Sequence, residues 1–154
     1  SKSRALSKSK KFFYDHHKKD FLVNFEEIKS IKNKNFILEI GFGLGENLLF
    51  QAKNFPQDYF IGIDPFINGV ANVVQKAKEF NLNNIYIVDT PVQSVIDNFS
   101  DNFFSKIFIL FPDPWMKNKQ KKRRLLNSLF LEKILKIIPF EKNCSVILMF
   151  LGAL

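Results

Sequence analysis

Residues 38–46 read LEIGFGLGE, an apolar segment that runs directly into a turn with glycine at every second position. The apolar segment (NFILEI, residues 35–40) predicts a buried strand, and residues 46–54 predict a helix after the turn. Further strands are predicted at 59–63, 84–88, 105–111 and 144–151, separated by helices at 65–80, 91–99 and 125–138. This alternation predicts an α/β fold, a doubly wound and mostly parallel sheet with helices on both faces.

The length of 154 residues suits one domain and is too short for two. Residues 1–11, rich in Ser and Lys, predict a basic mobile arm, and the apolar spacing in residues 12–30 predicts a helix that packs on the body. We therefore expect a single domain over residues 12–154. A hydrophobic content of 46% with 25% charged residues is typical of a globular chain and excludes a disordered one.

Composition also restricts the location and the partners. No apolar run is long enough to cross a bilayer, and the basic start has no apolar core of a signal peptide. The one cysteine, Cys144, excludes an intrachain disulfide and a cysteine zinc site. We expect a cytoplasmic protein with no membrane partner and no metal.

The net charge of +8 comes from two basic patches. Residues 1–19 hold seven Lys or Arg against Asp15, and residues 117–124 hold six, including Arg123 and Arg124, with no acid. The rest of the chain is mildly acidic. This distribution favours contact with a nucleic acid over an evenly solvated surface.

The glycine turn restricts the ligand. A dinucleotide-binding fingerprint needs glycine at 41, 43 and 46, but position 46 is Glu46, where a pyrophosphate would otherwise meet the helix N-terminus. Gly41 and Gly43 allow close approach to an uncharged nucleoside, and the carboxylate of Glu39 suits a cation. S-adenosylmethionine, which is cationic and carries no phosphate, meets both conditions. A simple tight turn between strand and helix stays open as the alternative.

Two further strand ends carry polar groups. Asp64 follows the strand at 59–63, where a carboxylate can accept both ribose hydroxyls, cap a helix that starts at Pro65, or do both. The strand at 105–111 runs into FPDPWMK, where two prolines fix the backbone around Asp113. Trp115 there suits a ring that stacks on a ligand or supports the wall of a site, and Lys117 begins the second basic patch.

Together, LEIGFGLGE, IGID and FPDPWMKNKQKKRRL resemble the bacterial tRNA (guanine-N7-)-methyltransferases, as does SRALS at residues 3–7. The resemblance implies a class I methyltransferase fold of the Rossmann-like kind and methyl transfer from S-adenosylmethionine to N7 of a guanosine in tRNA. It implies that Glu39 and Asp64 bind the cofactor, that Asp113 is the acidic residue of the catalytic site and that Lys117 contacts the substrate. Trp115, Arg123 and Arg124 complete the expected substrate site.

Two departures from that family's pattern affect these expectations. The family places an Asp after the third strand, where this chain has Pro91 and carries Asp89 two residues earlier. Either Asp89 or the backbone near Pro91 would then bind the adenine of the cofactor. The family also continues beyond its fifth strand with residues of the guanosine site, whereas this sequence ends at Leu154. We therefore expect an incomplete domain without its C-terminal strands, with an apolar edge at 144–151, poor solubility and little methyl transfer.

Two other classes of protein stay open. One is a non-catalytic RNA-binding protein on a methyltransferase scaffold. The other is an NAD-dependent oxidoreductase, against which Glu46 counts.

Overall fold

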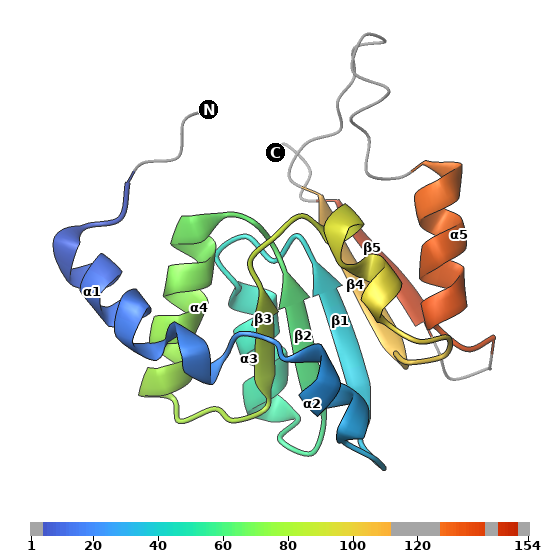
Figure 1. Ribbon diagram of the computed structural model, residues 1–154, viewed down its shortest axis with the longest axis horizontal. Coiled ribbons are helices and arrows are strands. Elements are labelled where there is room, and N and C mark those ends of the chain that lie inside the picture. Colours follow the sequence, from blue (N-terminus) through green and yellow to red (C-terminus); the bar gives the residue numbers. More distant parts are fainter. Residues whose placement is uncertain (1–4, 112–126, 141–144, 151–154) are drawn as a thin grey trace, which may run out of the picture.

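The computed structural model describes residues 5–111, 127–140 and 145–150. The described part is one layered α/β arrangement (Figure 1). Its strands are β1 (Phe36–Ile40), β2 (Tyr59–Ile63), β3 (Ile85–Val88), β4 (Lys106–Phe111) and β5 (Ser145–Phe150). Its helices are α1 (Lys8–His17), α2 (Phe25–Ser30), α3 (Glu46–Asn54), α4 (Ile67–Glu79) and α5 (Ser128–Ile137), with 3-10 turns η1 (Lys18–Asp20), η2 (Val92–Ser94) and η3 (Ile96–Asn98).

The five strands form one sheet in the order β3-β2-β1-β4-β5, with every pair parallel. The chain starts in the centre at β1, moves outward through β2 and β3, and then crosses to β4 and β5 on the other side of β1. The predicted doubly wound parallel sheet is confirmed. The direction of winding reverses between β1 and β4, and in such sheets the ligand binds at the carboxyl ends of the strands beside that reversal.

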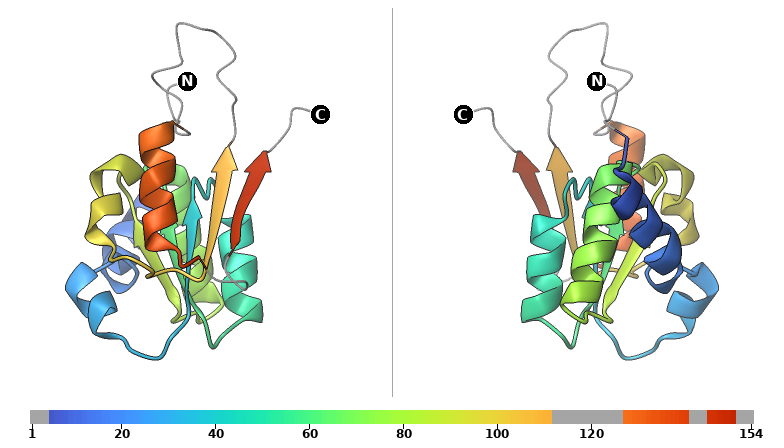
Figure 2. Two further views of the ribbon diagram at one scale, coloured as in Figure 1. Left: turned by 90° about the vertical axis from the view of Figure 1, so that its right-hand side faces the viewer. Right: turned by 90° about the vertical axis from the view of Figure 1, so that its left-hand side faces the viewer.

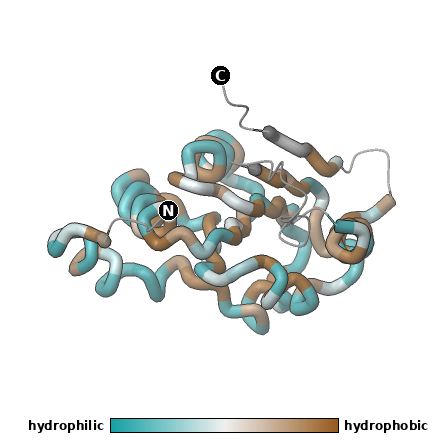
Figure 3. The backbone as a smooth tube through the Cα atoms, turned by 90° about the horizontal axis from the view of Figure 1, so that it is seen from above, coloured by the Kyte–Doolittle hydropathy of each residue, from teal (hydrophilic) through white to brown (hydrophobic). Residues whose placement is uncertain are grey.

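Helices cover both faces of the sheet (Figure 2). The core on one face joins α2, η2, η3 and α5 to the sheet, and the core on the other joins α1, α3 and α4. Seen from above, hydrophobic segments run through the middle of the molecule and hydrophilic ones lie toward its outside (Figure 3). Every residue of β1 is buried, since the strand is covered on both sides.

The predicted strands agree with the observed ones to within one residue at either end, but the predicted helix at 12–30 is wrong. It is three pieces, α1, η1 and α2. The break arises because Phe21 and Val23 pair with the edge of β3: Ile87 N donates to Phe21 O at 2.7 Å and Val23 N donates to Ile87 O at 2.9 Å. The start of the chain thereby covers an edge that would otherwise be unpaired.

Two helix starts also differ from prediction. Helix α1 begins at Lys8, inside the segment predicted as an arm, because the Ser7 side chain caps it by accepting from Lys10 N at 3.3 Å. Helix α4 begins at Ile67 rather than Pro65. The helix predicted at 91–99 is instead the two short turns η2 and η3.

Among the described residues, no helix is both long and apolar enough to cross a membrane. The same part of the chain contains no cluster of three or more His, Cys, Asp or Glu side chains that could hold a metal ion.

Candidate functional site

The turn after β1 is held in a left-handed conformation at all three glycines. The φ angles are +75° at Gly41, +57° at Gly43 and +80° at Gly45. Backbone hydrogen bonds from Gly41 N to Ile63 O and from Gly45 N to Phe42 O, both 2.8 Å, fix the turn to β2 and close it. Residues with a side chain rarely adopt these angles, so the backbone conformation favours glycine at all three positions.

The glycines at 41 and 43 face different surroundings. A Cβ at Gly41 would lie 2.5 Å from the carbonyl oxygen of Leu110, so β4 leaves no room for a side chain at this position. A Cβ at Gly43 would meet no atom within 4 Å. The backbone at Gly43 therefore borders open space at the carboxyl edge of the sheet, where a ligand can approach it closely.

Asp64 ties this turn to the end of β2. Its Oδ2 accepts from Gly43 N at 2.8 Å, and its Oδ1 accepts from Phe66 N at 2.9 Å. The predicted role of Asp64 as helix cap is wrong in detail, because the cap position of α4 is Phe66 and the bond to Asp64 lies ahead of the helix. Each carboxylate oxygen keeps acceptor capacity for a ligand hydroxyl.

Glu39 is the buried charged residue of the described core, only 2% exposed. Its Oε2 accepts from the side-chain amide of Asn47 at 2.8 Å, but its Oε1 has no hydrogen-bond partner. Burial raises the pKa of Glu39 to about 7, and the nearby Asp64 adds to this shift, while the Asn47 bond opposes it. A buried carboxylate oxygen without a partner is costly, so this atom is suited to receive a ligand cation.

Asp89 follows β3 directly and contacts the N-terminal helix. The Tyr14 hydroxyl on α1 donates to Asp89 Oδ2 at 3.4 Å. Burial raises the pKa of Tyr14 to about 12, with Asp89 as the next contribution, so the hydroxyl stays a donor. Pro91 precedes η2, with its carbonyl accepting from Ser94 N at 3.0 Å.

The sheet register brings these residues together. Ile40 lies beside Ile63, and Ile63 beside Val88, so Gly41, Asp64 and Asp89 leave three adjacent strands at one edge. The Asp64 amide also donates to Val88 O at 3.1 Å. The predicted cofactor residues thus form one group, which in chain order is Glu39, Gly41, Gly43, Asp64, Asp89 and Pro91.

The predicted catalytic and substrate residues lie outside the described residues. They are Asp113, Trp115, Lys117, Arg123 and Arg124. The structure does describe β4 up to Phe111, and Ile109 of β4 pairs with Ile40 of β1. The strand that leads into the FPDPW segment therefore ends at the same edge of the sheet as the glycine turn.

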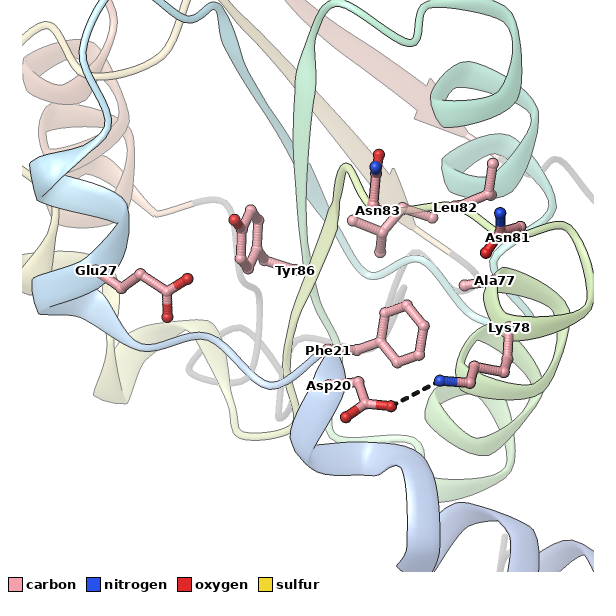
Figure 4. A pocket seen from close by; sticks show the side chains of 10 residues that line it. Asp20, Phe21, Glu27, Ala77, Lys78, Asn81, Leu82, Asn83 and Tyr86 are labelled. Carbon is pink, nitrogen blue, oxygen red and sulfur yellow. Dashed lines mark hydrogen bonds and ion pairs between the residues drawn. The ribbon is translucent and has the colours of Figure 1, made fainter.

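A pocket of about 380 Å³ lies elsewhere, near the start of β3. Lys78 reaches across it to Asp20, with Nζ and Oδ2 3.0 Å apart, and its other walls include Glu27, Asn81 and Tyr86 (Figure 4). We assign the function to the carboxyl edge instead, because that edge combines the open turn, the unpartnered buried carboxylate and the winding reversal.

Two residues that contact this group were not predicted from the sequence. Asn47 is the second residue of α3, and a polar residue two positions after the glycine turn was a usable signal. Tyr14 gave no signal, because its partner Asp89 is 75 residues away in the chain.

Comparisons with known proteins agree with this geometry. A family model described as "Putative methyltransferase" matches residues 33–145. The chain belongs to this methyltransferase family. The match spans β1 to the start of β5, and therefore the whole group at the carboxyl edge.

Curated relatives are similar to this methyltransferase domain over only part of their length. A "Bifunctional methyltransferase" of Rickettsia prowazekii (strain Madrid E) is 41% identical over 124 residues, which are 80% of this chain and 24% of the relative. A "tRNA (guanine-N(7)-)-methyltransferase" of Wolbachia pipientis wMel is 43% identical over 115 residues, 73% of this chain and 52% of the relative. The chain thus spans about a quarter to a half of these relatives.

Solved structures support the fold. Coclaurine N-methyltransferase, bound to N-methylheliamine and SAH, matches with a TM-score of 0.56 at 17% identity, covering 96% of this chain and 37% of that one. A tryptophan-to-alanine mutant of a 16S rRNA (adenine(1408)-N(1))-methyltransferase from Catenulisporales acidiphilia matches with a TM-score of 0.57 at 16% identity, covering 75% of this chain and 57% of that one. The predicted class I methyltransferase fold is confirmed.

Proposed function

We propose that this chain transfers a methyl group from S-adenosylmethionine to N7 of a guanosine in tRNA. The observation that carries the proposal is the unpartnered oxygen of buried Glu39 beside the open backbone of Gly43. The methyltransferase family and the names of the curated relatives support the substrate. A tRNA substrate in turn supports the cytoplasmic location expected from the sequence.

The residues present fit this cofactor. Glu39 offers a carboxylate oxygen to a cationic group, and Asp64 offers acceptors to ribose hydroxyls. Asp89 or the backbone near Pro91 lies at the next strand end, suited to the adenine. Glu46 occupies the first position of α3, where it disfavours the pyrophosphate of a dinucleotide.

The proposed methyl transfer depends mainly on how guanine N7 is oriented toward the methyl group of the cofactor. When bound, S-adenosylmethionine supplies a methyl group on a positively charged sulfur. Guanine N7 has a free lone pair and no proton to lose, so positioning rather than a strong base provides the acceleration. In the proposal, Asp113 stabilises the positive charge that the purine gains and accepts hydrogen bonds from its N–H groups.

The remaining residues would hold the RNA. Lys117, Arg123 and Arg124 would contact phosphates, which fixes the position of the tRNA more than it reads its sequence. Trp115 would stack on the guanine or support the wall of the site. On the described surface, α1 adds Lys8, Lys10 and Lys11 to the basic character.

A non-catalytic RNA-binding protein and an NAD-dependent oxidoreductase are the alternatives. The experiment that separates them combines ligand-dependent thermal unfolding with tritium transfer to bulk tRNA. We expect S-adenosylmethionine to raise the melting temperature and NAD to leave it unchanged. With a version of the chain extended at its C-terminus, label should appear in 7-methylguanosine, and it should be lost when that version carries Asp113→Ala.

A melting temperature raised by NAD alone would contradict the proposal. Cofactor and tRNA binding with no transfer, by this chain and by a version extended at its C-terminus, would favour the non-catalytic alternative. Arg123→Glu with Arg124→Glu should weaken tRNA binding without changing cofactor affinity.

A further inference from the structure

Tyr14 connects helix α1 to the functional edge. Tyr14 is the buried residue of α1, 6% exposed, and its ring packs with the core between α4 and the sheet. Its hydroxyl reaches Asp89. The views in Figures 1 and 2 agree that α1 lies along α4, away from β1 and β4.

From Asp89 a short path of hydrogen bonds leads to the glycine turn. The residue before Asp89, Val88, accepts from the amide of Asp64 at 3.1 Å. The carboxylate of Asp64 in turn accepts from the amide of Gly43 at 2.8 Å. Tyr14 is thus three hydrogen bonds from the backbone that borders the open space of the candidate cofactor site.

Helix α1 carries three lysine side chains, of which Lys8 and Lys11 are exposed and Lys10 is half-buried. Lys11 and Lys18 pair with Asp15, at 2.6 and 4.0 Å. Lys8 and Lys10 have no ion-pair partner within the part of the chain that the structure describes. Positive charge without an ion-pair partner, as at exposed Lys8 and half-buried Lys10, attracts a polyanion.

We infer that Tyr14 is a positioning residue for Asp89, and that it couples the binding of tRNA at the lysines of α1 to the binding of cofactor at the carboxyl edge. The inference rests on the proposed function. A polyanion bound to α1 would stabilise the packed position of the helix and so hold Tyr14 and, through it, Asp89 in the geometry that the cofactor needs. By linkage, the cofactor strengthens tRNA binding by the same factor.

The expected size of the coupling is modest. A distance of 3.4 Å is long for a bond from a hydroxyl to a carboxylate, so its removal has less effect than the loss of a short charged hydrogen bond. The measurement is the affinity for S-adenosylhomocysteine, by calorimetry, with and without saturating tRNA. We expect tRNA to tighten it by about fivefold in the unaltered chain.

Tyr14→Phe keeps the ring in the core and removes only the hydroxyl. We expect it to weaken S-adenosylhomocysteine binding by about threefold and to reduce the effect of tRNA to nearly none. Tyr86→Phe is the matched control. Tyr86 lies on β3 with a half-buried ring, and its hydroxyl has no hydrogen bond among the described residues, so this change should leave both quantities unaltered.

A double-mutant cycle separates positioning from packing. If Tyr14 acts through Asp89, then Tyr14→Phe should cost no further affinity once Asp89→Ala is present. Additive losses, or a Tyr14→Phe protein with the full effect of tRNA, would overturn the inference while leaving the proposed function intact. An unaltered chain that binds neither S-adenosylhomocysteine nor tRNA would overturn both.

Discussion

Because Glu39 is buried, its contribution to the free energy of unfolding depends on pH. Its pKa of about 7 lies above the ordinary 4.5, so the neutral carboxyl group contributes stability that is present in acid and is lost as the pH rises through about 7. Relative to Glu39→Gln, which imitates the neutral form, the unaltered chain should lose about 2 kcal/mol of unfolding free energy between about pH 5.5 and about pH 8. Urea unfolding of both proteins measures this.

Glu132→Gln is the control for that measurement, because Glu132 is exposed on α5 and its loss should leave the pH profile unchanged. A constant difference between the unaltered chain and Glu39→Gln across this range would contradict the buried neutral carboxyl group.

The carboxylate of Asp64 accepts hydrogen bonds from two backbone N–H groups, those of Gly43 and Phe66. An asparagine side chain, with one oxygen, cannot replace both of its oxygens. Asp64→Asn keeps one acceptor oxygen and turns an N–H group toward Gly43 N or Phe66 N. We expect a loss of about 1–2 kcal/mol in unfolding free energy and weaker binding of S-adenosylhomocysteine. Asp101→Asn, at an exposed turn before β4, should change neither in the same unfolding and calorimetry runs. Equal behaviour of the two variants would show that Asp64 does not organise the turn.

At the scale of elements, variants of the glycine turn distinguish its effect on stability from its effect on ligand binding. Gly41→Ala adds a methyl group against the Leu110 carbonyl as well as left-handed strain, so it should cost several kcal/mol, on the order of 3. Gly43→Ala carries the strain alone, about 1 kcal/mol, because its methyl group enters open space.

The same methyl group at position 43 would occupy the proposed ligand space. Gly43→Ala should therefore lose cofactor binding while it keeps most of its stability, as seen by calorimetry beside urea unfolding. A Gly43→Ala protein that binds normally would place the ligand elsewhere.

For the whole molecule, the charge distribution predicts how tRNA binding depends on salt. The logarithm of the affinity should fall linearly with the logarithm of salt concentration, and Lys8→Glu with Lys10→Glu should make the slope shallower. Lys32→Glu with Lys34→Glu is the matched control. It changes the net charge by the same amount, but both residues lie just before β1, at the amino ends of the strands and away from the candidate site at their carboxyl ends. Filter binding over a range of salt concentrations tests this. Equal effects of the two pairs would mean that only net charge matters and not the position of the two lysines on α1.

Much of the architecture could be predicted because its signals are local. Each strand is a short apolar run bounded by turn residues, so its bounds came within one residue, and Gly41, Gly43 and Asp64 could be identified as strand-end residues. Helix bounds were less accurate. Ser7 caps a helix earlier than apolar spacing indicates, and pairing of Phe21 and Val23 with β3 breaks one that spacing alone would continue.

The residue types and their periodicity were sufficient for the fold class, the parallel sheet and the candidate site, because backbone preference and alternating burial act over a few neighbouring residues. The order of the strands, the unpartnered oxygen of Glu39 and its raised pKa, and the contact between Tyr14 and Asp89 followed only from packing. These features depend on groups that are distant in the chain and on the exclusion of water when they meet. Desolvation has no signature in a linear pattern, because it is created by the elements that close over a side chain.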